Sequence, residues 1–395
     1  MNVRISAWRR FWPLWLCLLL CMAAGGLYVG RSQTESILAF QQRCNELSAE
    51  GKWEELAPLA KRWSEIEPQA ADPWLFRANA AEGIKDWEAV AANLDRVPRT
   101  DPRAAAALVR KAIAEFEPLN RPWQGMQTCD EILELEPRVL IAHKQTIFFC
   151  AMTLQRAEMV RRIRRAISVR RESPESYIYL VGASWLYSGA LYRHNTHWLK
   201  GDPDSELFQV AQAMQVYTSQ AKSDLERSAE FEHIPTPEQM LERYPHNLEL
   251  IAFLLSRTIT AGDLEQVQSL LQRIPTEVAD KDARFWRARA WCQDAAGELE
   301  QSEQSLRKSY ALDRYWWQVH FQLHDLLRRL GRREESDQFL KIYQLSKELS
   351  TTIMTLNRTE DGFNDPGFSQ SLLKLAEMIG DQDVAAALRE RVDAR

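Results

Sequence analysis

Apolar residues recur at three- and four-residue spacing along almost all of the chain beyond residue 31. This spacing places apolar side chains on one face of an α-helix, whereas a half-buried strand would alternate apolar and polar residues. Alternating runs are almost absent. The pattern therefore predicts an all-α fold built from amphipathic helices.

Prolines add a second, longer period to this helical pattern. Pro68, Pro102 and Pro137 are 34 and 35 residues apart in the contexts EIEP, RTDP and ELEP, and Pro174 follows after 37 residues. Each comes near the end of an amphipathic segment, where a residue without a backbone N–H stops a helix. The spacing predicts a repeated unit of about 34 residues.

Glycines keep the same period later in the chain, because Gly262, Gly297 and Gly331 are 35 and 34 residues apart and each divides two amphipathic segments. With these turn residues the sequence resembles the tetratricopeptide repeat (TPR) family, whose unit is a pair of antiparallel helices. The resemblance covers roughly residues 37–174 and 248–350. It implies an α-solenoid of about seven TPR-like hairpins, since one hairpin needs neighbours to bury both faces.

The period fails between the two blocks, where a polar, turn-rich stretch begins near Arg193. Thr236, followed by Pro237 and then Gln239, predicts a capped helix start within this stretch. The predicted organisation after the first 35 residues has four parts: TPR-like block 1 at 36–174, an irregular helical insertion at 175–245, TPR-like block 2 at 246–350, and a loop with capping helices at 351–395.

The N-terminus has the pattern of a membrane anchor. Residues 1–10 contain three arginines and no acid, and residues 11–30 contain no charge. Twenty helical residues span about 30 Å, enough to cross the hydrocarbon core. Since positive residues stay on the cytoplasmic side, we expect a single-pass signal anchor with an extracytoplasmic body, periplasmic in a bacterium. A cleaved signal peptide and a secreted body are the alternative.

The body is acidic, because residues 31–395 carry 47 bases against 55 acids, a net charge of −8. This balance argues against a dedicated nucleic-acid binder, so no nucleic-acid partner is expected. Cys129 and Cys150 are placed to meet across one hairpin, although buried free thiols are the expected state. Their pairing is not decided by the sequence.

No catalytic motif accompanies the repeats. The sequence lacks GxSxG, Walker A and GxGxxG motifs. His320 and His324 have the spacing of metal ligands, but their repeat positions pack inward and favour core histidines. We expect no catalytic residue, metal or cofactor. The alternative is a metal- or enzyme-linked assembly factor whose site in the 175–245 insertion uses His194 and His197.

The resemblance to TPR proteins implies a concave groove, lined by the first helix of each repeat, that holds a protein or peptide. The predicted groove residues are both aromatic and basic, and a surface of this kind suits a ligand with acidic and apolar side chains. The alternative is that Trp291 and Phe321 only pack between repeats. Mapped onto the later repeats, the groove residues are Arg284, Arg287, Trp291, Phe321, Asp325 and Arg328.

A second candidate surface is the segment from Arg156 to Arg171, which contains seven arginines and one acid. Arg161, Arg162 and Arg165 are its candidate contacts to an anionic partner. The alternative is a solvated helix face. Together the patterns predict a membrane-anchored bacterial-type TPR protein that acts as a non-catalytic scaffold or adaptor in assembling a protein complex.

Overall fold

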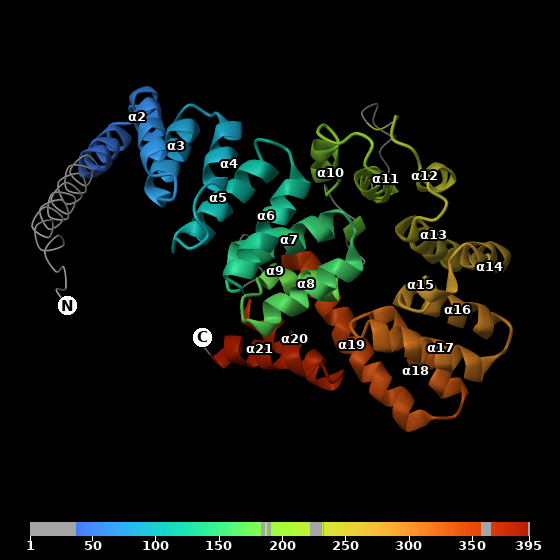
Figure 1. The fold of residues 1–395 in the computed structure, drawn as a ribbon. Helices are drawn as coiled ribbons and strands as arrows, with labels where there is room; N and C mark the ends of the chain where they lie inside the picture. Colours follow the sequence, from blue (N-terminus) through green and yellow to red (C-terminus); the bar gives the residue numbers. More distant parts are fainter. Residues whose placement is uncertain are drawn as a thin grey trace, which may run out of the picture. The chain divides into compact units, whose positions relative to one another are not determined.

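The computed structural model describes residues 37–182, 186–187, 191–221, 231, 233–356 and 365–393. These residues form helices and turns, and none of them lies in a strand (Figure 1). The predicted anchor at residues 11–30 lies outside this part of the chain. Among the helices within it, none is both long and apolar enough to cross a membrane.

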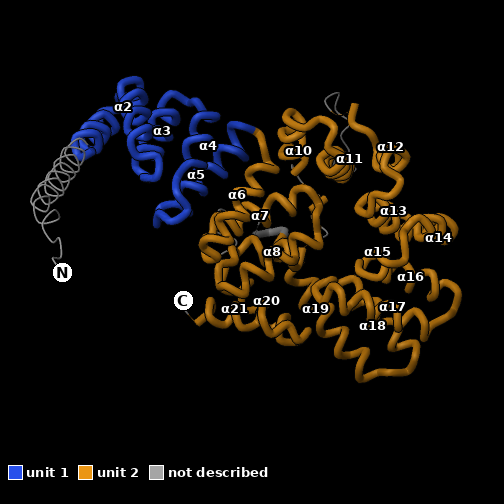
Figure 2. The backbone as a smooth tube through the Cα atoms, in the orientation of Figure 1, with its two compact units in different colours: residues 1–119 blue, residues 120–395 orange. Residues whose placement is uncertain are grey.

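The chain divides into two compact units, residues 1–119 and 120–395 (Figure 2). The boundary falls inside the predicted block 36–174. Residues 37–49 of unit 1 are helical. Its other helices are α2 (Trp53–Ile66), α3 (Ala71–Gly83), α4 (Trp87–Asp95) and α5 (Ala104–Phe116).

Unit 2 begins with α6 (Pro122–Leu135), α7 (Leu140–Met152) and α8 (Arg156–Ser168). The segment predicted as an irregular insertion contains α9 (Pro174–Val181), α10 (Tyr192–Trp198), α11 (Glu206–Ala221) and α12 (Pro237–Arg243). The later helices are α13 (Leu248–Ala261), α14 (Leu264–Gln272), α15 (Thr276–Ala279), α16 (Ala283–Ala295), α17 (Leu299–Leu312), α18 (Trp317–Arg329), α19 (Arg333–Leu356), α20 (Pro366–Met378) and α21 (Gln382–Asp393).

The helices pack as hairpins with the predicted period, including α7 with α8, α16 with α17 and α18 with α19. The all-helical, TPR-like hairpin architecture implied by the resemblance is therefore present. The predicted boundary at residue 351 falls inside α19, which continues to Leu356.

One backbone feature repeats in the turn between the two helices of a hairpin, where a single residue has positive φ. The predicted Gly262, Gly297 and Gly331 have φ of 77, 80 and 77°. The same turn occurs earlier at Gly51, Lys85 and Leu154, and two of these three positions carry a side chain. Asn120, with φ of 52°, continues the 34–35-residue spacing in the segment between α5 and α6. The turn geometry is thus kept even where it costs roughly 1–2 kcal/mol of backbone strain.

A second repeated feature lies in the first turn of four helices that open a hairpin. A ring nitrogen of the fourth residue of each helix is hydrogen-bonded to the backbone carbonyl oxygen of the residue six positions earlier. The nitrogen–oxygen distances are 2.9 Å for Trp74, 2.9 Å for His143, 3.1 Å for Trp286 and 2.8 Å for His320. Because a carbonyl only accepts, each histidine donates from Nε2. Burial lowers the pKa of both histidines, that of His320 to about 4.

The C-terminal hairpin, formed by α20 and α21, is hydrogen-bonded to earlier segments of unit 2. Asp381, in the turn between α20 and α21, accepts two hydrogen bonds from Arg164 of α8, at 2.7 and 2.5 Å. It accepts a third, at 3.0 Å, from the Tyr315 hydroxyl in the turn before α18. One buried carboxylate therefore joins three segments that are far apart in sequence.

The insertion is held by buried amides rather than by the repeat pattern. Asn195 of α10 and Gln215 of α11 both donate to the Met152 carbonyl, at 2.9 and 3.0 Å. At the other end of the insertion Thr236 forms the predicted capping box with Gln239. The stretch predicted to be turn-rich from Arg193 begins instead with helix α10 at residues 192–198, and the turns follow it at residues 199–204.

Candidate functional site

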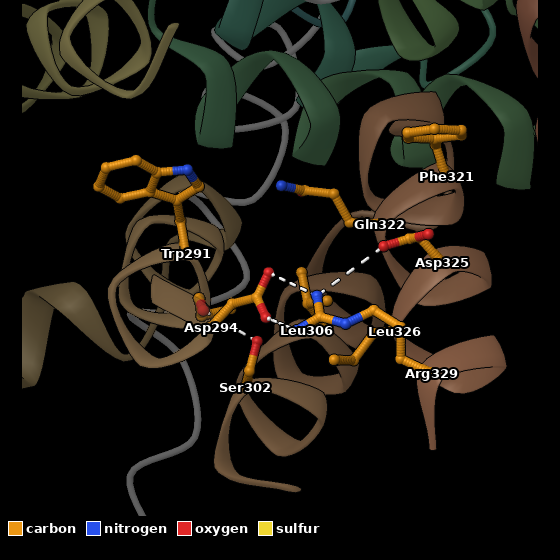
Figure 3. A pocket seen from close by; sticks show the side chains of 10 residues that line it. Trp291, Asp294, Ser302, Leu306, Phe321, Gln322, Asp325, Leu326 and Arg329 are labelled. Carbon is orange, nitrogen blue, oxygen red and sulfur yellow. Dashed lines mark hydrogen bonds and ion pairs between the residues drawn. The ribbon is translucent and has the colours of Figure 1, made fainter. Parts of the chain in front are cut away.

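A hollow of about 80 Å³ lies between α16 and α18, the first helices of two successive hairpins, with α17 completing its wall (Figure 3). Three of the residues predicted for the groove line it: Trp291, Phe321 and Asp325. The full lining is Ala290, Trp291, Asp294, Ser302, Leu306, Phe321, Gln322, Asp325, Leu326 and Arg329.

The rim of the hollow is aromatic and reaches solvent. Phe321 is 47% exposed, although its neighbours Leu323 and Leu326 are buried in the same helix. The Trp291 and Phe321 rings lie on opposite sides of the hollow, and the Gln322 side chain points from α18 into the space between them (Figure 3). Buried residues thus fix the backbone of α18 while an aromatic surface remains accessible.

The deeper part of the hollow is charge-balanced. Arg329 is 2.7 Å from the Asp294 carboxylate and 3.9 Å from that of Asp325 (Figure 3). Ser302 donates to the Ala290 carbonyl at 2.8 Å. These contacts hold α16, α17 and α18 together, and Arg328, which pairs with Asp325 at 2.9 Å, supplies the second positive charge that balances the two carboxylates.

Arg287 is different from the other arginines of these helices. It lies one turn before Trp291 on α16, and its Nε donates to Gln322 Oε1 at 2.8 Å. Its guanidinium lies 5.0 Å from the Trp316 ring centre. Among the described residues Arg287 has no carboxylate partner, and burial lowers its pKa to about 10.

Two other predicted groove arginines are held by acids. Arg284 makes two hydrogen bonds of 2.7 Å to Glu249 and pairs with Asp282 at 2.6 Å, so it joins α16 to α13 and does not line the hollow. Arg328 is exposed and pairs with Asp325 at 2.9 Å. It also lies outside the lining.

The arginines of α8 are engaged within the chain. Arg162 makes a two-pronged ion pair with Asp130, at 2.6 and 3.0 Å, and only 9% of its side chain is exposed. Arg165 donates to the Leu133 carbonyl at 3.0 Å. Arg161 pairs with Glu158 but keeps 63% of its side chain exposed. These three residues are distant in sequence from the hollow and contribute nothing to its lining.

The histidines and cysteines have local packing roles. His194 packs edge-on against Phe148 on α7, with ring centres 4.9 Å apart. His324 Nδ1 lies 2.8 Å from Ser336 Oγ. Cys129 and Cys150 are buried and are not joined by a disulfide. In the described part of the chain, no three His, Cys, Asp or Glu side chains gather as a metal site would require.

Sequence reasoning missed Asp294, Gln322 and Arg329 in the hollow, although the repeat period contained a signal for them. Residues 35 apart face one another on neighbouring first helices: Arg287 bonds to Gln322, and Arg329 bonds to Asp294. Matching each residue of one first helix with the residue 35 positions further on identifies both of these contacts.

Comparison with known proteins finds solved structures of low similarity. No protein-family model matches the chain, and no curated protein matches it significantly. The crystal structure of the APC/C hetero-tetramer Cut9-Hcn1 is similar, with 11% identity, a TM-score of 0.31, and coverage of 88% of this chain and 77% of that one. The crystal structure of yeast Tom70 has 13% identity, a TM-score of 0.26, and coverage of 91% and 76%.

Proposed function

We propose that this protein is a non-catalytic scaffold that binds a protein partner in the hollow between α16 and α18 and thereby helps to assemble a complex. The observation that carries the proposal is the exposure of Phe321, at 47%, beside Trp291 and a hollow of about 80 Å³. A void of this size holds several water molecules, which an apolar side chain of a partner would displace. Aromatic anchors beside pockets are typical of the residues that dominate protein interfaces.

The test is selection of random displayed peptides on the full chain, followed by affinity measurement with wild type and variants. Phe321→Ala is expected to weaken binding of selected peptides at least tenfold, the effect of losing a hot-spot aromatic side chain. Leu312→Ala is the matched control, because Leu312 is also 47% exposed but lies outside the hollow. Equal loss in both variants, or no selected peptide, would contradict the proposal.

The proposal includes attachment to a membrane through residues 11–30, with the hairpins outside the cytoplasm. It is supported by the uncharged run of twenty residues and by the three arginines before it. Deleting residues 11–30 is expected to move the chain from the membrane fraction to the soluble fraction. Retention of the deleted form in membranes would contradict this part.

A further inference from the structure

Arg287 stands out among the arginines of α16, α17 and α18. Arg284, Arg289 and Arg307 each pair with a carboxylate within 3.0 Å. Arg287 has only the neutral Gln322 amide and the Trp316 ring as partners among the described residues. A half-buried guanidinium without a counter-charge gives up part of its hydration and gains little in return. Such a group favours a ligand that brings the missing negative charge.

The groups around Arg287 are arranged as hydrogen-bond donors beside apolar walls. Gln322 accepts from Arg287 through Oε1, which leaves its amide Nε2–H₂ as the end of the side chain that donates. This side chain points between the Trp291 and Phe321 rings (Figure 3). The Gln322 amide therefore offers its donors at the aromatic rim, and Arg287, which does not line the hollow itself, adjoins it through its hydrogen bond to Gln322. Carboxylate oxygens are the acceptors that suit both groups.

We infer that the partner of this site is a peptide segment in which an Asp or Glu side chain, held by Arg287 and Gln322, lies next to an apolar residue held between Trp291 and Phe321. The inference rests on the proposed function and adds the partner's chemistry to it. The experiment below distinguishes this side-chain carboxylate from the C-terminal carboxylate of a peptide.

Charge complementarity also determines that the site prefers acidic peptides to basic ones. The acids of the hollow are already paired, Asp294 with Arg329 and Asp325 with Arg328, so they do not favour a basic partner residue. A lysine in the peptide would meet Arg287 as a like charge, which is unfavourable in a partly desolvated groove. The site therefore distinguishes acidic from basic peptides through one residue.

The experiment uses the full chain and peptides selected as described above, measured by fluorescence anisotropy. Replacing the peptide's acid by the corresponding amide is expected to weaken binding about tenfold or more, as for other close charge pairs at interfaces. Arg287→Gln is expected to cause the same loss for the acidic peptide and no further loss for the amide peptide. Arg287→Lys should retain part of the affinity, because it keeps the charge without the planar donors.

Arg289→Gln is the matched control, because Arg289 lies on the same helix but pairs with Asp280 at 3.0 Å and packs on Trp286. Circular dichroism of each variant checks that it folds. Selected peptides without an acid, or equal affinity of wild type and Arg287→Gln, would overturn the inference while leaving the Phe321 result intact. Loss of binding on amidation of the peptide C-terminus would also overturn it, since a terminal carboxylate would then be the ligand. Selection of no peptide would overturn both proposals.

Discussion

The α7–α8 hairpin and the pair α16 and α18 both carry many arginines, but the two regions use them in opposite ways. Arg162 and Arg164 of α8 are held in two-pronged ion pairs by Asp130 and Asp381. Arg287 of α16 has no carboxylate partner among the described residues. The number of cations on a helix is therefore a poor guide to a binding surface, because their pairing decides which charges remain for a ligand.

The largest expected effect tests the structural role of the α8 arginines. Asp381→Ala should lower the free energy of unfolding by about 4 kcal/mol, because it leaves Arg164 and the buried Tyr315 hydroxyl without their partner. Urea denaturation of the full chain measures this change. Asp383→Ala, an exposed acid two residues further on, is the control and should change little. An Asp381→Ala variant as stable as wild type would remove the contrast between the two regions.

A second prediction concerns the neutral histidines that both regions bury, His143 in α7 and His320 in α18. His320 has its pKa lowered to about 4, so between about pH 6.5 and 4 the unfolded chain binds a proton that the folded chain does not. The resulting stabilisation is present above pH 6.5 and lost as the pH falls to 4, with a full size of about 3 kcal/mol.

Denaturation of wild type and His320→Gln at pH 7.5 and near pH 4.5 checks this window. The wild type should lose more stability than the variant on acidification. The exposed His246→Gln substitution controls for removal of a histidine as such. Equal losses in wild type and His320→Gln would show that the folded chain accommodates the imidazolium ion.

The smallest expected effect concerns the turns of the two regions. Gly297, between α16 and α17, has φ of 80° and free space around its α-carbon, so Gly297→Ala should cost only the backbone term, about 1 kcal/mol. The corresponding turn between α7 and α8 already carries that strain at Leu154, which is buried. Conversely, Lys85→Gly at the exposed equivalent turn should stabilise the chain by about 1 kcal/mol. Thermal melting measures both changes in stability. Gly297→Ala must lower the melting temperature and Lys85→Gly must raise it.

The hairpins could be predicted because the apolar period and the glycine turns are local properties of the sequence. The turns at Lys85 and Leu154 could not, since nothing in these residues favours positive φ and the surrounding packing imposes it. Helix α10 was missed for a related reason. It is only seven residues long, and just Asn195 and Trp198 are buried, which is too few for a visible period.

The aromatic part of the hollow was predictable, because Trp291 and Phe321 occupy the groove positions of their helices. The pairing of each arginine could not be predicted, because it depends on acids elsewhere in the chain. Arg284 is neutralised by Glu249, 35 residues away, and Arg164 by Asp381, 217 residues away. The composition gives only the number of charged residues, whereas the fold determines which of them form ion pairs.

The distance of 217 residues between Arg164 and Asp381 has a consequence for how the protein is made. Each hairpin consists of contacts close in sequence and can form soon after its own residues are synthesised. The ion pair between Arg164 and Asp381 cannot form until the chain has been completed past α20. Arg164 therefore lacks this partner while the intervening helices emerge, whereas Arg162 can already pair with the earlier residue Asp130.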